Sequence, residues 1–196
     1  VRLDPLTLKS QLTITEGQLF ELMARRGRLE AERDDSEDVT FELELLQAAA
    51  ENAEWRDLVY GQLRLFYARR SSVESEVDQL EERRHQALNQ IDGIKAQQIS
   101  TNGQLDLIQK ELKDQRMLYD RGLAQASKVM ALEREAVKLD GRLGELKSQK
   151  AQAEGLHAEI GIQILHLARQ RREDSITRLR DLYYREMELV EQRTSL

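Results

Sequence analysis

The side chains that could carry out chemistry are few and scattered along the chain. The three histidines are His85, His157 and His166. His157 and His166 are nine residues apart in a helical pattern, so they do not share a helix face as an i, i+4 metal-binding pair does. The adjacent carboxylates Glu81 and Glu82 are followed by two arginines, which is typical of a solvated helix surface. No HExxH, CxxC or EF-hand pattern is present. We therefore expect no enzyme: no catalytic residue, no cofactor-binding residue, no cofactor and no metal site.

The glycines include one phosphate-like spacing, Gly141-Arg142-Leu143-Gly144. A phosphate cradle of this kind follows a β-strand, whereas the flanking pattern here is helical. Gly17, Gly27 and Gly61 also fall inside helical patterns, where each costs up to about 1 kcal/mol relative to alanine. They indicate either bending of the helices or a close approach between them, and the sequence does not separate the two.

Composition identifies the elements that must position any functional side chain. Among 196 residues there is one proline, no cysteine and only 5% aromatic residues, while 34% are charged and the formal net charge is −6. Proline breaks helix interiors, so a chain that nearly lacks it is suited to long helices. These values argue against β and α/β folds and disulfide scaffolds. The acidic balance argues against nucleic acid as a partner.

Heptad spacing of apolar residues predicts the helices themselves. After Asp4-Pro5, a typical helix start, leucines follow a seam of alternating three- and four-residue steps through Leu29. We predict a strand exit and first helix over 1–33, a linker over 34–48 and a long helix over 49–119. One seam of that long helix contains Phe66, Ala87 and Ile94, and its partner seam contains arginines and a glutamine among the apolar residues.

The pattern stops at residues 120–126, which we interpret as a hairpin tip, and a second long helix is predicted over 127–196. Near its end the apolar pattern changes phase, with Ile176, Tyr183 and Val190 on one line and Leu182 and Leu189 on another. The predicted fold class is all-α: an elongated antiparallel coiled-coil hairpin of two long helices, with a shorter N-terminal helix packed near its open end. Each long helix would measure about 105 Å.

The tip is unusual for a segment that only reverses the chain. It combines apolar and basic side chains, and its local charge is positive in an acidic protein. Such a combination at a remote tip indicates a docking site for another protein; an ordinary turn between two helices, with its own small apolar cluster, remains the alternative. The candidate partner-binding residues are Arg116, Leu118, Tyr119, Asp120, Arg121, Gly122, Leu123 and Ser127.

Several strings, in this order and spacing, give the chain a family resemblance: LEAERD at 29–34, QLRLFYARR at 62–70, LIQKEL at 107–112 and ALEREAVKLDGRLGEL at 131–146. With them, nearly the whole chain resembles the α-helical hairpin domain of HlyD-type membrane fusion proteins, the periplasmic adaptors of bacterial type I secretion systems. Members of that family carry a tip motif of Arg, then Leu four residues later, then Ser or Thr seven after that. Arg116 and Ser127 match it, whereas Asp120 occupies the leucine position, and Leu118 is a possible substitute.

The resemblance implies a function and its partners. The tip would dock onto a TolC-like outer-membrane channel, and the hairpins of a homo-oligomer, expected to be a hexamer, would wall a conduit for unfolded protein. The parent protein would be anchored in the inner membrane, contact an ABC transporter there and place this segment in the periplasm. A start without Met, VRLDPLTLKS, also suggests a fragment of a longer protein. The alternative function is a cytosolic structural coiled-coil rod, such as a spectrin-like or filament segment.

Overall fold

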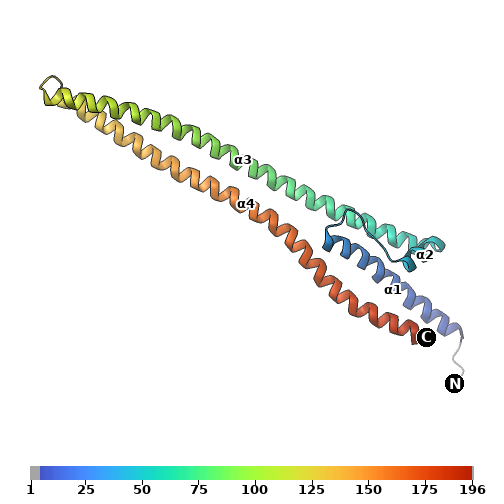
Figure 1. The fold of residues 1–196 in the computed structure, drawn as a ribbon. Coiled ribbons are helices and arrows are strands. Elements are labelled where there is room, and N and C mark those ends of the chain that lie inside the picture. Colours follow the sequence, from blue (N-terminus) through green and yellow to red (C-terminus); the bar gives the residue numbers. More distant parts are fainter. Residues whose placement is uncertain (1–4, 196) are drawn as a thin grey trace. The chain divides into compact units, whose positions relative to one another are not determined.

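The computed structural model describes residues 5–195, and within that range helices are the regular elements. They are α1 (Pro5–Asp34), α2 (Leu43–Glu51), α3 (Ala53–Asp120) and α4 (Ala126–Ser195) (Figure 1). The chain divides into two compact units. Unit 1 comprises Val1–Val77 and Ile164–Leu196, and unit 2 comprises Asp78–Gln163. The prediction of an all-α hairpin with a shorter N-terminal helix is confirmed.

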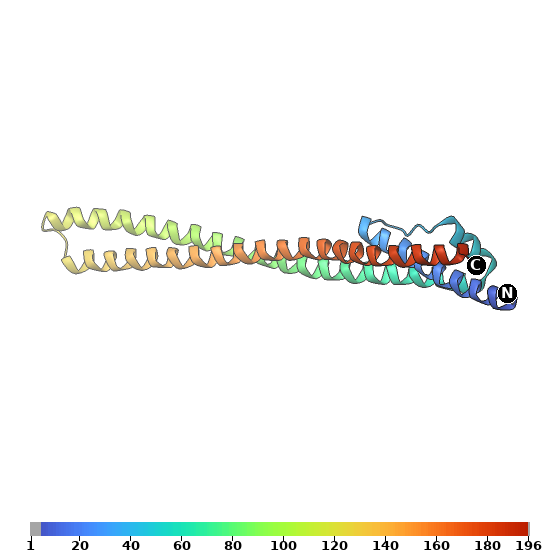
Figure 2. The same ribbon diagram turned by 90° about the horizontal axis from the view of Figure 1, so that it is seen from below.

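Unit 2 is a two-helix hairpin made from the last part of α3 and the first part of α4, which run antiparallel and are joined by a short turn (Figure 2). Its core is a seam between the helices, where Ile91 and Ile94 of α3 pack with Leu146 and Ala153 of α4. Leu146 is fully buried. A seam this narrow leaves most of each helix surface in solvent, which explains the high charge content of the sequence.

The polar positions of the predicted seam also face the partner helix. Arg84, Gln98 and Thr101 are all half-buried, although their immediate neighbours in sequence are mostly exposed. The side chain of Arg84 passes Gly161 of α4, where an added β-carbon would lie 3.9 Å from its guanidinium carbon. The heptad period therefore located these positions correctly despite their polarity.

Unit 1 has a broader core because a third and a fourth helix join the hairpin there. Residues from α1, α2 and α3 form one buried cluster: Leu19, Phe20, Met23, Ala24, Leu45, Ala49 and Val59. Trp55 packs against this cluster, with its ring edge to face against Phe20 at 5.4 Å between centroids. From α4, Leu189 and Val190 complete the contact.

Helix α1 ends in a left-handed residue that is not glycine. Asp35 has φ of 52°, and the amide of Ser36 donates to the carbonyl oxygen of Ala31 at 3.0 Å. This six-to-one hydrogen bond is half of a Schellman cap, and aspartate tolerates the left-handed region better than most residues.

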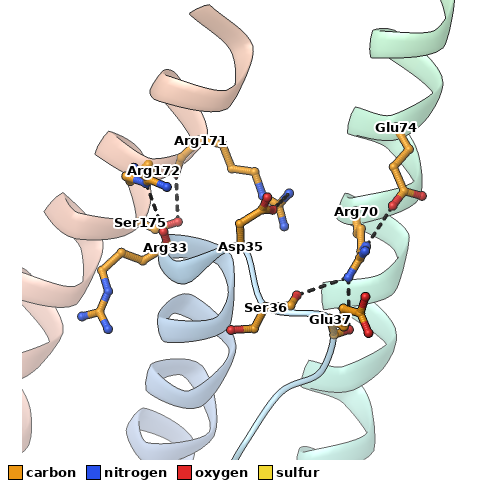
Figure 3. Close-up of polar contacts among 9 residues, drawn as sticks. All are labelled: Arg33, Asp35, Ser36, Glu37, Arg70, Glu74, Arg171, Arg172 and Ser175. Atoms are coloured by element: carbon orange, nitrogen blue, oxygen red, sulfur yellow. Dashed lines mark hydrogen bonds and ion pairs between the residues drawn. The ribbon is translucent and has the colours of Figure 1, made fainter. Parts of the chain in front are cut away.

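Arginines from the two long helices fasten this end of α1 (Figure 3). Arg70 of α3 donates to the carbonyl oxygens of Ser36 and Glu37, each at 3.2 Å. From α4, Arg172 donates to the carbonyl oxygen of Arg33 at 3.2 Å, and Arg171 pairs with Asp35 at 3.4 Å. Arg172 thus satisfies a backbone carbonyl that the end of α1 leaves open, and the arginine at seam position 70 satisfies two carbonyls of the segment that follows.

The segment that follows α1 corrects one expectation. We predicted a linker over 34–48 and a long helix from 49, but residues 43–51 form the separate helix α2 and α3 begins at Ala53. Asn52 is extended between them, and its side chain accepts a hydrogen bond from the amide of Glu54 at 2.9 Å. The nine residues of α2 carry an apolar face with Leu45 and Ala49 buried, so tertiary packing supports a helix too short to be stable alone.

The phase change in α4 lies where α1 ends. Arg171 and Ser175 both face inward, and the Ser175 hydroxyl donates to the Arg171 carbonyl oxygen at 2.9 Å. Beyond them Leu182 is buried, but Ile176 and Tyr183 are about half exposed. Of the two lines after the phase change, the one with Leu182 faces the core, whereas Ile176 and Tyr183 lie on the exposed side of α4.

The predicted strand exit at 1–3 and the helix cap at Asp4 lie outside the described residues. Over 5–195, none of the helices contains an apolar stretch that could cross a lipid bilayer.

Candidate functional site

The turn between α3 and α4 is closed by a complete Schellman cap. Gly122 has φ of 73°, its amide donates to the carbonyl oxygen of Tyr119 at 2.8 Å, and the amide of Leu123 donates to that of Leu118 at 2.8 Å. Only glycine takes this conformation without steric cost, which is why the turn lies here. The two hydrogen bonds fix the backbone direction of the residues that follow.

Apolar side chains on this turn stay in solvent. Leu123 is 72% exposed, Tyr119 47% and Leu118 38%. A leucine just after a Schellman glycine often packs back onto the helix it terminates, whereas this one remains open. The turn therefore presents apolar surface on a rigid backbone, which is the property expected of a docking surface.

Sequence reasoning missed one exposed apolar residue beside the turn. Met117 precedes Leu118 and is 48% exposed. Its position in the last turns of a helix that is about to end would have been the signal, because the seam there offers no partner for a residue outside the heptad positions.

Ion pairs tie the two helices together next to the turn. Arg116 of α3 pairs with Glu133 of α4 at 2.5 Å, and Lys128 of α4 pairs with Glu111 of α3 at 3.1 Å. All four side chains are between 41% and 57% exposed, so each pair contributes at most about 1 kcal/mol. Arg116 is thus accessible but already has an acidic neighbour.

The remaining candidates lie on the same exposed turn. Asp120 ends α3, Arg121 and Gly122 form the turn, and all three are exposed. Ser127 is the second residue of α4 and not its cap, since the helix begins at Ala126; its hydroxyl donates to the side-chain oxygen of Gln125 at 3.4 Å. The hydroxyl is exposed, and the structure brings Ser127 to the same short turn as the other candidates.

No arrangement for metal chemistry occurs in the described range 5–195, where no three His, Cys, Asp or Glu side chains converge. The glycine spacing at 141–144 lies within α4, where added β-carbons would meet nothing within 4 Å. These glycines therefore mark neither a phosphate cradle nor a close helix approach.

Unit 1 contains a buried carboxyl, that of Glu186, whose pKa is raised. Glu186 is 6% exposed, and one of its oxygens accepts from Arg26 at 2.5 Å while the other has no partner. Arg26 also pairs with Glu42 and Glu30. Burial raises the pKa of the Glu186 carboxyl, Arg26 opposes that rise, and the charges of Glu42 and Glu30 reinforce it. This network joins α1 to α4 and lies away from the turn in sequence.

Comparison with known families now places this hairpin. A sequence model described as "AprE, long alpha-helical hairpin" matches residues 8–196, which is nearly the whole chain. The chain belongs to this family.

One curated relative of this AprE hairpin is the type I secretion system membrane fusion protein PrsE of Rhizobium meliloti (strain 1021). The two are 33% identical over 195 residues, which is all of this chain and 44% of PrsE. The chain thus spans less than half the length of that relative. Among solved structures, the soluble domain of LipC, a membrane fusion protein of a type I secretion system, superposes with a TM-score of 0.93. It is 19% identical, with 100% of this chain and 91% of that chain covered, and it shows the shared fold.

Proposed function

We propose that this chain is the periplasmic hairpin segment of a type I secretion membrane fusion protein, and that its turn docks onto a TolC-like outer-membrane channel. The observation that carries the proposal is the 33% identity with PrsE along the entire chain. The conduit role follows from this: several copies, six by the family resemblance, would stand side by side, with the parent protein held in the inner membrane beside an ABC transporter.

The turn supports the docking part of the proposal by its geometry. Its backbone is fixed by two hydrogen bonds, so little conformational entropy is lost when a partner binds. It offers Leu123 and Tyr119 as apolar contacts, with Arg121 as an exposed cation between them in sequence. Aromatic and arginine side chains are enriched among the residues that dominate interface energies.

The test is secretion by the full-length parent protein carrying Arg116→Asp. We expect export of its cognate substrate to be abolished, because the change reverses a charge on the docking surface. Glu133→Gln is the matched control, since it breaks the same intramolecular ion pair but leaves Arg116 in place. Normal export by the Arg116→Asp variant would contradict docking through this residue.

Ser127→Asp tests the same surface without weakening the helix. Ser127 lies in the first turn of α4, where a negative side chain is favourable to the helix dipole. Helicity measured by circular dichroism should therefore be unchanged while secretion is lost. Loss of both would point to misfolding, and full secretion would remove Ser127 from the contact.

A further inference from the structure

A cavity of about 420 Å³ lies within unit 1, bounded by α1, α3 and α4. Its volume falls in the range of roughly 300–1,000 Å³ that is usual for small-molecule pockets. Part of its wall is apolar and comes from all three helices: Leu22 and Leu29 of α1, Leu65 of α3 and Leu182 of α4. The rest of the wall is dominated by arginine, and none of these residues belongs to the turn.

One arginine of this cavity is buried and held in a fixed position. The side chain of Arg28 is 7% exposed, its Nε donates to the side-chain oxygen of Gln62 at 2.8 Å, and its Nη1 pairs with Glu32 at 2.5 Å. Its second terminal nitrogen, Nη2, has no bond within residues 5–195, and it is not among the buried unpartnered atoms of that range. A preorganised guanidinium therefore keeps N–H groups available to a ligand.

Two further arginines reach the cavity from α4. Arg178 and Arg185 are exposed, and neither has a carboxylate within 4 Å in the described part of the chain. Asp181 lies between them on the same helix, lines the cavity and is likewise unpaired there. The fourth arginine, Arg25, pairs with Glu21. The cavity lining therefore carries four arginines and one acid, so it has an excess of positive charge.

We propose that this cavity binds a single-chain amphiphilic carboxylate, the class of ligand that joins one negative charge to an apolar tail. An anionic head matches the excess positive charge of the lining, and a planar carboxylate suits the paired donors of a guanidinium. The tail would lie on the leucines of the wall. A fully polar anion would use the arginines but leave this apolar surface uncovered.

The experiment titrates the 196-residue chain with decanoate and measures heat by calorimetry, with 1-octanol and inorganic phosphate as comparison probes. We expect saturable binding of one decanoate per chain, at least about tenfold tighter than either comparison probe, because octanol lacks the negative charge and phosphate lacks the apolar tail. Equal binding of octanol would overturn the role of the arginines. Equal binding of phosphate would overturn the role of the leucines.

A double variant, Arg178→Gln with Arg185→Gln, tests the location. Both side chains are exposed, so the fold should persist, and decanoate affinity should fall about tenfold or more. Arg180→Gln is the matched control because Arg180 is also exposed on α4 but does not line the cavity, and it should bind decanoate normally. Unchanged affinity in the double variant would overturn the proposal.

Phosphatidylglycerol vesicles complete the test by separating a free ligand from a membrane surface. The proposal expects decanoate to bind in the absence of any vesicle and the double variant to lose that binding. Binding to vesicles with no saturable binding of decanoate would contradict a cavity for a single amphiphile and would identify a surface attraction to anionic lipid instead.

Discussion

Helices α1 and α3 end with the same backbone conformation, but the surroundings of the two ends differ. α1 closes at Asp35 and α3 closes at Gly122, each with a left-handed residue followed by a six-to-one hydrogen bond. At Asp35, three arginines from α3 and α4 bind the backbone carbonyls and the carboxylate. At Gly122, the neighbouring apolar side chains remain exposed and an added β-carbon would meet nothing within 4 Å.

This difference distinguishes a helix end that other helices hold in place from a helix end whose side chains are available to a partner. An end that other helices fasten can use aspartate, because its surroundings supply interactions that offset the cost of a left-handed residue. An end with no such support needs glycine, the residue that takes this conformation freely. The exposed end therefore depends on its own local hydrogen bonds for its shape.

The largest effect on the free energy of unfolding should come from Gly27→Ala in α1. A β-carbon at Gly27 would lie 2.7 Å from the carbonyl oxygen of Thr40 and 2.9 Å from the ring of Phe41. These two residues must therefore move away from α1. We expect a loss of about 1–3 kcal/mol in the free energy of unfolding, measured by urea denaturation.

Gly61→Ala is the control for this change. Gly61 lies inside α3 with open space around it, so alanine should stabilise the chain by about 0.5–1 kcal/mol. Equal effects at both glycines would mean that Thr40 and Phe41 shift at little cost and do not pack tightly against Gly27.

The next effect is expected at the exposed turn, with Gly122→Ala. Alanine has the space but must adopt φ near 73°, which costs about 1–2 kcal/mol. Amide exchange of Leu123 should accelerate by a corresponding factor, while exchange in α1 stays unchanged. Gly141→Ala, in the interior of α4, should instead be stabilising. A neutral Gly122→Ala would show that the cap does not control this turn.

The pH dependence of the unfolding free energy should reveal the buried Glu186 of unit 1. Because burial raises the pKa of Glu186 in the folded state, its contribution to stability is present below the unfolded pKa and is lost as pH rises through the folded pKa. Glu186→Gln removes this loss, so its stability relative to the parent chain should increase as the pH rises from the unfolded pKa to the raised folded pKa of Glu186.

Thermal unfolding of the two chains across that range measures the effect. Glu188→Gln, an exposed change on the same helix, should leave the pH dependence as it was. A constant difference between Glu186→Gln and the parent chain at every pH would show that the Glu186 carboxyl is not perturbed by burial.

The smallest effect should come from Asp35→Gly. Glycine relieves the left-handed strain, worth about 1–2 kcal/mol, but forfeits the exposed pair with Arg171, worth about 0.2–1 kcal/mol. We expect a modest net gain in unfolding free energy. Asp35→Asn loses the pair and keeps a residue that tolerates this conformation, so it should be slightly destabilising. A net loss for Asp35→Gly would show that the arginine contact outweighs the strain.

Most of the hairpin follows from period alone. Seam residues such as Ile91, Leu105 and Leu146 are buried at the heptad positions that their spacing predicts. The end of α3 at Asp120 follows from one glycine two residues further on, because a local cap needs only local sequence. Leu123 is exposed on this turn, and the docking role of the turn stays a prediction.

What sequence missed depends on contacts between distant residues. The left-handed Asp35 carries no glycine signal, and the inward shift of the α4 seam to Ser175 depends on where α1 ends. The short helix α2 depends on α1 for the burial of Leu45. Heptad periodicity reports the contact of one helix with its partner, so it could not predict contacts with a third helix.

The paired seam of unit 2 restricts how such hairpins change length. Ile91, Ile94, Leu146 and Ala153 interlock only if both helices keep the same seven-residue phase. An insertion in α3 must therefore be matched by an equal one in α4, and each unit of seven residues adds about 10 Å. The hairpin lengths of homologues should therefore differ by whole heptads.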